Sequence, residues 1–402
     1  MHPFCHANIL LPRQADMEKW AVIACDQFAS QPEYWAQARQ LVGDAPSALK
    51  LILPESELEG DCSTAIAAIH ETMRRYLQEN LFQTYENSFI YVERTLENGT
   101  VRRGVVGALD LCSYDSDPNA HAIVRATEET VAERVPPRME IRRGASLELP
   151  HVLLLCDDFQ RQLIESLTAK KDSLPLLYDF DLMLSGGRIR GWLVAGEDEK
   201  AFSEELELYA RRTRERYGET AVLYALGDGN HSVAAAKACY LENPHEKARY
   251  ALVELENIHD DAQVFEPIHR IVKGTDVDKL ISAMEDAIGG ENGAEVTWHA
   301  AGRTGRIRVA PVAGQLTVGT VQKFLDDYLR HNTGVIDYIH GLDAVVSLSQ
   351  AENTVGFVLP DVDKGEFFHS IIVGGTLPRK TFSMGHAREK RYYLEARRID
   401  AL

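Results

Sequence analysis

A polar turn at residues 227–232 has the residue types and spacing that phosphate chemistry needs. It contains, in order, Gly227, Asp228, Gly229, Asn230, His231 and Ser232. An apolar strand is predicted at 221–226 and a small-residue helix after it, with Ser232 as the N-cap. The first turn of a helix offers free backbone N–H groups and the positive end of the helix dipole, so it can bind a phosphate. Gly227 and Gly229 let the backbone approach such a ligand closely.

Two side chains of this turn can take part in the chemistry itself. Asp228 can hold a divalent cation such as magnesium or accept a hydroxyl proton, and His231 can donate to a phosphoryl oxygen. The alternative is a capped strand-to-helix turn in which Asp228 and Asn230 make only local hydrogen bonds. The sequence leaves both interpretations open.

A second group of charged residues lies between residues 123 and 138 and includes the stiff pair Pro136-Pro137. Arg134 and Arg138 are natural clamps for phosphate or carboxylate groups, and Glu128 can serve as a base or a metal ligand. The alternative is the start of a helix, with Thr127 as its cap and with Glu128 and Glu129 in its first turn.

A basic, hydroxyl-rich turn at 377–385 is the third candidate segment. Arg379 and Lys380 can form an anion site there, and the alternative is a solvated loop. The glycine-rich motifs of dinucleotide-binding folds and P-loops are absent, as are the α/β-hydrolase nucleophile motif and HExxH. Those classes of site are therefore disfavoured.

The composition excludes several classes of protein. The chain has 402 residues, 43 Lys and Arg against 61 Asp and Glu, and a formal net charge of −18. Such an acidic balance argues against nucleic acid as a partner. No apolar run is long enough to predict a membrane span, and the N-terminus does not read as a secretory signal. With six scattered cysteines, which indicate reduced thiols, we expect a cytoplasmic protein.

Alternating patterns predict a mixed α/β protein with mixed sheets and flanking helices. The predicted elements are helices at 64–82, 198–217 and 276–288, hairpins at 88–95 with 101–111 and at 178–184 with 188–194, buried strands at 151–156 and 221–226, and short strands around Val296, Ile307 and Leu316. A change of composition after Lys273 predicts a main region at 1–274 that carries the site. A smaller subdomain is predicted at 275–335, and a C-terminal segment at 336–402 that packs back on the main region.

Several strings resemble a bacterial and archaeal family known as domain of unknown function 1015. They are KWAVIACDQF at 19–28, QPEYW at 31–35, RVPPR at 134–138, LELPHV at 147–152, GDGNHS at 227–232 and LPRKTFSMG at 377–385. The resemblance covers nearly the whole chain. It implies no settled activity.

The turn itself is similar to the phosphate-binding turn of the ParB/sulfiredoxin-like superfamily, which includes free-serine kinases. That resemblance implies ATP or ADP, with magnesium, at Asp228, Gly229, Asn230 and His231, and it makes Glu128 the counterpart of the base toward a substrate hydroxyl. Ser232 stands where the superfamily often has an arginine, so a bidentate phosphate clamp is missing. Arg138, or Arg379 and Lys380, can supply that charge from another segment.

These expectations favour a nucleotide-dependent kinase that acts on a small hydroxylated metabolite. Phosphoryl transfer needs a phosphate cradle, a divalent cation, positive charge and one base, and the three segments contain those parts. A hydrolase or lyase of a small anionic metabolite is the first alternative. A non-catalytic regulator that binds a nucleotide or metabolite is the second.

Overall fold

The computed structural model describes residues 2–58, 60–117, 120–149, 151–378 and 380–401, and the chain divides into two compact units. Unit 1 comprises Met1–Gln263 and Gly385–Leu402, and unit 2 comprises Val264–Met384. The sequence predicted boundaries at 274/275 and 335/336. The observed boundaries lie elsewhere because unit 2 already begins with the strands that precede residue 274, and because its chain continues past residue 336 through two more strands and two helices.

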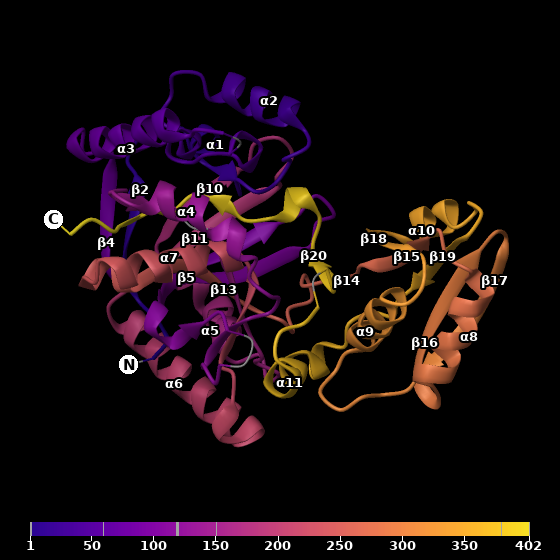
Figure 1. Cartoon of the computed structure of the whole chain (residues 1–402). Coiled ribbons are helices and arrows are strands. Elements are labelled where there is room, and N and C mark those ends of the chain that lie inside the picture. Colours follow the sequence, from indigo (N-terminus) through magenta and orange to yellow (C-terminus); the bar gives the residue numbers. More distant parts are fainter. Residues whose placement is uncertain (1, 59, 118–119, 150, 379, 402) are drawn as a thin grey trace. The chain divides into compact units, whose positions relative to one another are not determined.

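The main sheet of unit 1 has eleven strands within the described residues, in the order β10-β11-β4-β5-β13-β9-β12-β7-β6, with β1 paired to β5 and β2 to β4. Figure 1 labels β2, β4, β5, β10, β11 and β13 of this sheet. The strands are β1 Phe4–Cys5, β2 Ala7–Pro12, β4 Phe82–Thr95, β5 Val101–Asp110, β6 Tyr114–Asp115, β7 Val124–Ala126, β9 Leu153–Cys156, β10 Leu176–Asp181, β11 Arg188–Val194, β12 Tyr224–Asp228 and β13 Tyr250–Asn257. Two short pairs complete the strands of this unit: β3 Val22–Ile23 with β21 Tyr392–Tyr393, and β8 Leu147–Glu148 with β22 Arg397–Arg398.

The α-helices of unit 1 are α1 Met17–Trp20, α2 Pro32–Val42, α3 Ser63–Gln78, α4 Val135–Arg142, α5 Leu163–Lys170, α6 Glu197–Tyr217 and α7 Asn230–Glu242. Side chains alternate along each strand, so the sheet has two apolar faces. On β13, Leu252 packs in the core that α2 and α3 cover, whereas Leu255 packs in the core that α5, α6 and α7 cover. The expected mixed α/β class, with helices flanking the sheet, is confirmed.

Local sequence patterns account for most of these elements. The predicted hairpins form as β4 with β5 and as β10 with β11, both antiparallel. The first turns at Gly99, whose φ of 82° suits glycine. In α3, Ile69, Met73 and Tyr76 are buried at helical spacing.

Unit 2 contains a five-stranded sheet within the described residues, in the order β17-β16-β19-β15-β18, and a separate two-stranded pair. Its elements are β14 Phe265–Pro267, β15 His269–Lys273, α8 Val277–Ile288, β16 Gly289–Ala300, β17 Arg303–Val309, α9 Thr317–Leu329, β18 Val335–Ile339, α10 Leu342–Leu348, β19 Thr354–Val358, α11 Lys364–Gly374 and β20 Phe382–Met384. The predicted helix at 276–288 and the strands around Val296 and Ile307 are confirmed. The strand predicted around Leu316 is wrong, because that residue is the N-cap of α9.

No helix in the described part of the chain is both long enough and apolar enough to cross a bilayer.

Candidate functional site

The turn between β12 and α7 lies at one edge of the main sheet. β12 runs parallel to β7, with Leu226 opposite Ala126, so the carboxyl ends of both strands meet at this edge. Gly229 is the N-cap of α7 and has a φ of 82°. A Cβ atom on Gly229 would lie 2.9 Å from Cγ2 of Val152, so only glycine fits without a shift.

Ser232 is therefore not the N-cap, and that prediction is wrong. The left-handed conformation of Gly229 turns the chain into the helix at Asn230, which places Ser232 at the third helical position. The backbone N–H groups of Ser232 and Val233 already donate to the carbonyl of Gly229. The Oδ1 atom of Asn230 is buried and has no hydrogen-bond partner among the residues that the structure describes.

Asp228 is held by a lysine that the sequence did not predict for the site. Its Oδ1 accepts from the backbone N–H of Gly229 at 2.9 Å, and its Oδ2 lies 3.2 Å from Nζ of Lys390. Both side chains are largely shielded from solvent, at 17% and 15% exposure. An ion pair at this depth is weakly screened, so it orients the carboxylate.

The segment that follows β7 packs along β12 and the start of α7. Thr127 donates its hydroxyl proton to the carbonyl of Leu226 at 2.7 Å. The backbone N–H of Val131 donates to Nε2 of His231 at 3.1 Å. The alternative that made Thr127 a helix cap is wrong: the chain stays non-helical until a 3-10 turn at Ala132–Arg134 and then α4, because Thr127 bonds to the neighbouring strand instead.

The charged residues predicted for this segment take different positions. Glu128 is half-buried. It lies two residues after Ala126 of β7, and Asp228 lies two residues after Leu226, which is the partner of Ala126 on β12. Arg134 is exposed. Arg138, on α4, forms an ion pair with Glu55 at 3.4 Å and also lines a cavity beside α7.

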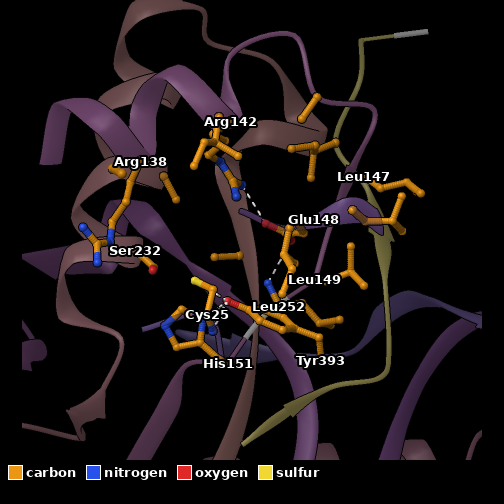
Figure 2. Close-up of a pocket in the computed structure, with 18 of the residues that line it drawn as sticks. Cys25, Arg138, Arg142, Leu147, Glu148, Leu149, His151, Ser232, Leu252 and Tyr393 are labelled. Carbon is orange, nitrogen blue, oxygen red and sulfur yellow. Dashed lines mark hydrogen bonds and ion pairs between the residues drawn. The ribbon is translucent and has the colours of Figure 1, made fainter. Parts of the chain in front are cut away.

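That cavity has a volume of about 150 Å³ and is mostly apolar (Figure 2). Its polar side chains come from distant segments: Cys25, Arg138, Arg142, Glu148, His151, Ser232 and Tyr393. Figure 2 shows Cys25, His151 and Tyr393 grouped together, with Arg138 and Ser232 toward one side and Arg142 and Glu148 toward another. Ser232, the third residue of α7, therefore lines this cavity. Gly227, Asp228 and His231 come shortly before Ser232 in the sequence.

Tyr393 connects the cysteine and the histidine of this group. Its hydroxyl donates to Sγ of Cys25 at 3.0 Å and lies 2.7 Å from Nδ1 of His151. Burial raises the pKa of the Cys25 thiol to about 12, so the thiol stays protonated. Burial alone would raise the pKa of Asp26 too, but His151, Gln27 and Lys390 lower it below its ordinary value. This group does not supply a thiolate nucleophile.

The opposite side of the cavity is closed by ion pairs. Glu148 lies 2.7 Å from Arg142 and accepts from Nε of Arg397 at 2.7 Å. Burial raises the pKa of Glu148, but the two arginines outweigh it and the pKa lies below its ordinary value. These charges satisfy one another, so they add little polarity that a ligand could use.

Two further predicted residues, Arg379 and Lys380, come from the basic turn at 377–385. Arg379 lies outside the described residues. Lys380 belongs to unit 2, where its exposed side chain lies 5.2 Å from the ring centroid of Tyr338. No group of three or more His, Cys, Asp and Glu side chains that could hold a metal ion occurs among the described residues. A cation at Asp228 would need oxygen ligands from a bound phosphate as well.

Sequence reasoning missed Lys390, Asp26, His151, Cys25 and Tyr393 as members of the site. Three of them had a signal. Asp26 and Cys25 lie in the string at 19–28, and His151 lies in the string at 147–152, both of which carry the resemblance described above.

Comparisons with known proteins give one clear match and several distant ones. No curated protein matches the sequence. Among solved structures, free serine kinase in complex with AMP is 12% identical over 71% of this chain and 90% of that chain, with a TM-score of 0.37. A mutant of free serine kinase in complex with ADP is 12% identical over 75% and 94%, with a TM-score of 0.38. A C-terminally truncated SbnI from Staphylococcus aureus is 10% identical over 70% and 83%, with a TM-score of 0.37.

The sequence also matches a family over residues 6–398, which is nearly the whole chain. Its description is "Protein of unknown function (DUF1015)". The expected family assignment is confirmed: the chain belongs to this family of proteins of unknown function.

Proposed function

We propose that this protein is a nucleotide-dependent kinase of a small hydroxylated metabolite, with the nucleotide phosphates at the first turn of α7. The observation that carries the proposal is the Asp228–Lys390 pair beside that turn. A carboxylate and an ammonium group at a helix N-terminus are the parts that a cation-bound phosphate needs. In the absence of nucleotide they neutralise each other.

The pair then exchanges partners when a nucleotide binds. Lys390 turns from the Asp228 carboxylate to a phosphate oxygen, and Asp228 becomes available to a magnesium ion bound to the same phosphates. Magnesium is commonly held by one or two carboxylates together with substrate phosphates, and it neutralises charge on the transferred group. The Asp228 carboxylate keeps its orientation through the Gly229 N–H.

Charge from a neighbouring helix supports the same arrangement. Arg138 lines the cavity that Ser232 also lines, so it supplies positive charge where the superfamily often has an arginine at the position of Ser232. Glu128 is the base toward the acceptor hydroxyl, at the same sheet edge as Asp228. Its half-buried position keeps the carboxylate partly out of water.

Thermal unfolding with ATP or ADP, with and without magnesium, tests the proposal. A ligand that binds the native state raises the apparent stability in proportion to the logarithm of its concentration over Kd. We expect ATP to raise the Tm, with a larger rise when magnesium is present. Asp228→Asn should remove the magnesium-dependent part and leave a smaller, magnesium-independent rise.

Asp115→Asn is the matched control, since Asp115 pairs with Lys237 of the same helix at 3.8 Å. This variant should respond to ATP and magnesium as the natural protein does. No response to any nucleotide would contradict the proposal and favour the hydrolase or lyase alternative. A response without phosphoryl transfer to any alcohol would favour a nucleotide-binding regulator.

A further inference from the structure

The segment that carries Lys390 begins where the chain returns to unit 1. Gly385 is the first residue after that return, and a 3-10 turn at Ala387–Glu389 comes directly before Lys390. After Lys390 the chain enters β21, and the N–H of Ala24 donates to the carbonyl of Arg391 at 2.9 Å. Lys390 itself lies outside any helix or strand. Its main chain is therefore held in place mainly by side chains of neighbouring segments.

Arg94, the second-last residue of β4, binds this main chain. Its guanidinium donates to the carbonyls of three successive residues, 388–390, and to the carbonyl of Gly186 in the turn between β10 and β11. The bond to Glu389 is 3.0 Å long and the bond from Nη2 to Gly186 is 2.9 Å long. Arg102 on β5 also donates to the carbonyl of Glu389, at 2.8 Å. Because the donors of a guanidinium lie in one rigid plane, Arg94 fixes the four carbonyls relative to β4.

The burial of Arg94 is costly. The residue is 2% exposed, and its hydrogen bonds within the described structure go to main-chain carbonyls rather than to a carboxylate. Burial, together with the charge of Arg102, lowers the pKa of Arg94 to about 10, so the guanidinium still carries its charge at neutral pH. A charge buried in this way is a poor means of gaining stability. Its role is better explained by the position of the chain that it holds.

That position decides what the ammonium group of Lys390 can reach. Nζ lies 3.2 Å from Oδ2 of Asp228, and a lysine side chain is flexible, so the ammonium group stays near one partner only if its main chain is fixed. We infer that Arg94 is a positioning residue for Lys390: by holding the carbonyls of 388–390, it keeps the ammonium group within reach of Asp228 and of a phosphate at the first turn of α7. The phosphate part of this inference rests on the proposed function, and the Asp228 part does not.

Arg94→Lys tests the inference with ADP, because this variant keeps the charge and removes the planar fork. One ammonium group cannot reproduce the set of bonds that the guanidinium makes to two segments. In the natural protein, Lys390→Met should raise the Kd for ADP about tenfold without magnesium, since it removes a charge-assisted hydrogen bond. In Arg94→Lys, the same substitution should raise that Kd less than about threefold, because the lysine is no longer held at the phosphate. A tenfold effect in both backgrounds would overturn the inference.

Urea unfolding without nucleotide tests the same inference on the ion pair alone. Lys390→Met and Asp228→Asn, made singly and together, measure the coupling between the two side chains. We expect this coupling to change the unfolding equilibrium constant by about threefold or more in the natural protein, and to vanish in Arg94→Gln. Arg94→Gln is the background of choice here because it folds without burying a charge. Equal coupling in the two backgrounds would overturn the inference.

Arg270→Lys is the matched control. Arg270, in unit 2, is 0% exposed and donates to the carbonyls of Ile268 and Lys380 at 2.6 and 3.0 Å. Its replacement should lower stability, because it also removes a buried guanidinium that binds main chain, yet the tenfold effect of Lys390→Met on ADP binding should remain. Loss of that effect in the control would overturn a specific role for Arg94.

The results separate this inference from the proposed function. If ADP does not bind to the natural protein, the kinase proposal fails and the urea experiment alone decides the role of Arg94. If ADP binds but neither the coupling nor the effect of Lys390→Met depends on Arg94, the inference fails and the kinase proposal stands.

Discussion

Nζ of Lys390 lies 3.2 Å from Oδ2 of Asp228. This ion pair joins the C-terminal segment of unit 1, residues 385–402, to the turn that precedes α7. Opposite charges at this distance stabilise each other, and each lowers the local charge that a ligand meets. A dianionic or trianionic phosphate must therefore compete with Asp228 for the lysine. A divalent cation removes that competition by binding the carboxylate.

Replacing Lys390 with methionine should weaken nucleotide binding most strongly when magnesium is absent. Without the ammonium group, the charge of the Asp228 carboxylate is no longer offset by Lys390, so the carboxylate repels the phosphates more strongly. We expect Kd for ADP to rise on the order of tenfold without magnesium and less with it, since one charge-assisted hydrogen bond is worth about 1.5–3 kcal/mol. Isothermal titration measures both values. Lys237→Met, which removes a lysine of α7, is the control and should leave both values unchanged. Equal effects of the two variants would contradict a specific role for Lys390.

His231→Ala should reduce both stability and nucleotide binding. The substitution leaves the Val131 N–H without the Nε2 acceptor at 3.1 Å, so the free energy of unfolding should fall by about 1 kcal/mol. Chemical denaturation gives this value, and titration with ADP gives the change in Kd. His231→Gln, which can again offer an acceptor to Val131, should recover stability better than it recovers binding. Loss of stability with unaltered ADP binding would leave His231 with a structural role only.

Gly229→Ala should destabilise the protein more than a second glycine substitution with the same backbone angle. Gly229 and Gly99 both have a φ of 82°, but a Cβ on Gly99 meets nothing within 4 Å. Gly99→Ala therefore reports the cost of the left-handed conformation alone, about 1 kcal/mol. Gly229→Ala adds the 2.9 Å contact with Val152 and should cost about 1–3 kcal/mol more. Urea unfolding of both variants measures the difference, and equal losses would show that Val152 moves aside freely.

Glu256 should make stability fall as the pH rises from about 5 to 8. Burial, opposed by Arg102 and reinforced by Glu254, raises the pKa of Glu256 to about 8 from the ordinary 4.5. Between these two values the folded chain holds a proton that the unfolded chain has released, so the free energy of unfolding decreases with rising pH. Glu256→Gln, which stays neutral, should flatten this dependence in urea unfolding at pH 5, 6.5 and 8. An identical pH profile in the variant would show that Glu256 is already ionised in the folded protein.

Short-range patterns were sufficient to predict much of the fold. The hairpin predicted at 88–95 with 101–111 forms as β4 and β5, with the pair Asn98-Gly99 in its turn, and the helix predicted at 64–82 forms as α3. The turn at 227–232 was also predicted as a strand-to-helix connection. These elements depend on turn chemistry and on periodicity within about twenty residues, and both can be read from the chain itself.

The start of α7 and the partners of its turn depended on contacts that no local pattern contains. Gly229 rather than Ser232 is the N-cap of the helix, and Val152, the residue before β9, leaves no room for a side chain at position 229. Lys390 reaches Asp228 because the chain returns to unit 1 after forming unit 2. The boundaries of the two units differ from the predicted ones for the same reason, since strands separated by a long stretch of sequence pair in one sheet.

The sequence alone determined the family, the mixed α/β class and the polar turn, because these depend on residue identity and spacing along the chain. Only the tertiary structure decided that Cys25, His151 and Tyr393 meet in one cavity and that the cavity is apolar. Hydrogen bonds and burial depend on distances in space, and residues such as His151 and Tyr393 lie 2.7 Å apart although most of the chain separates them.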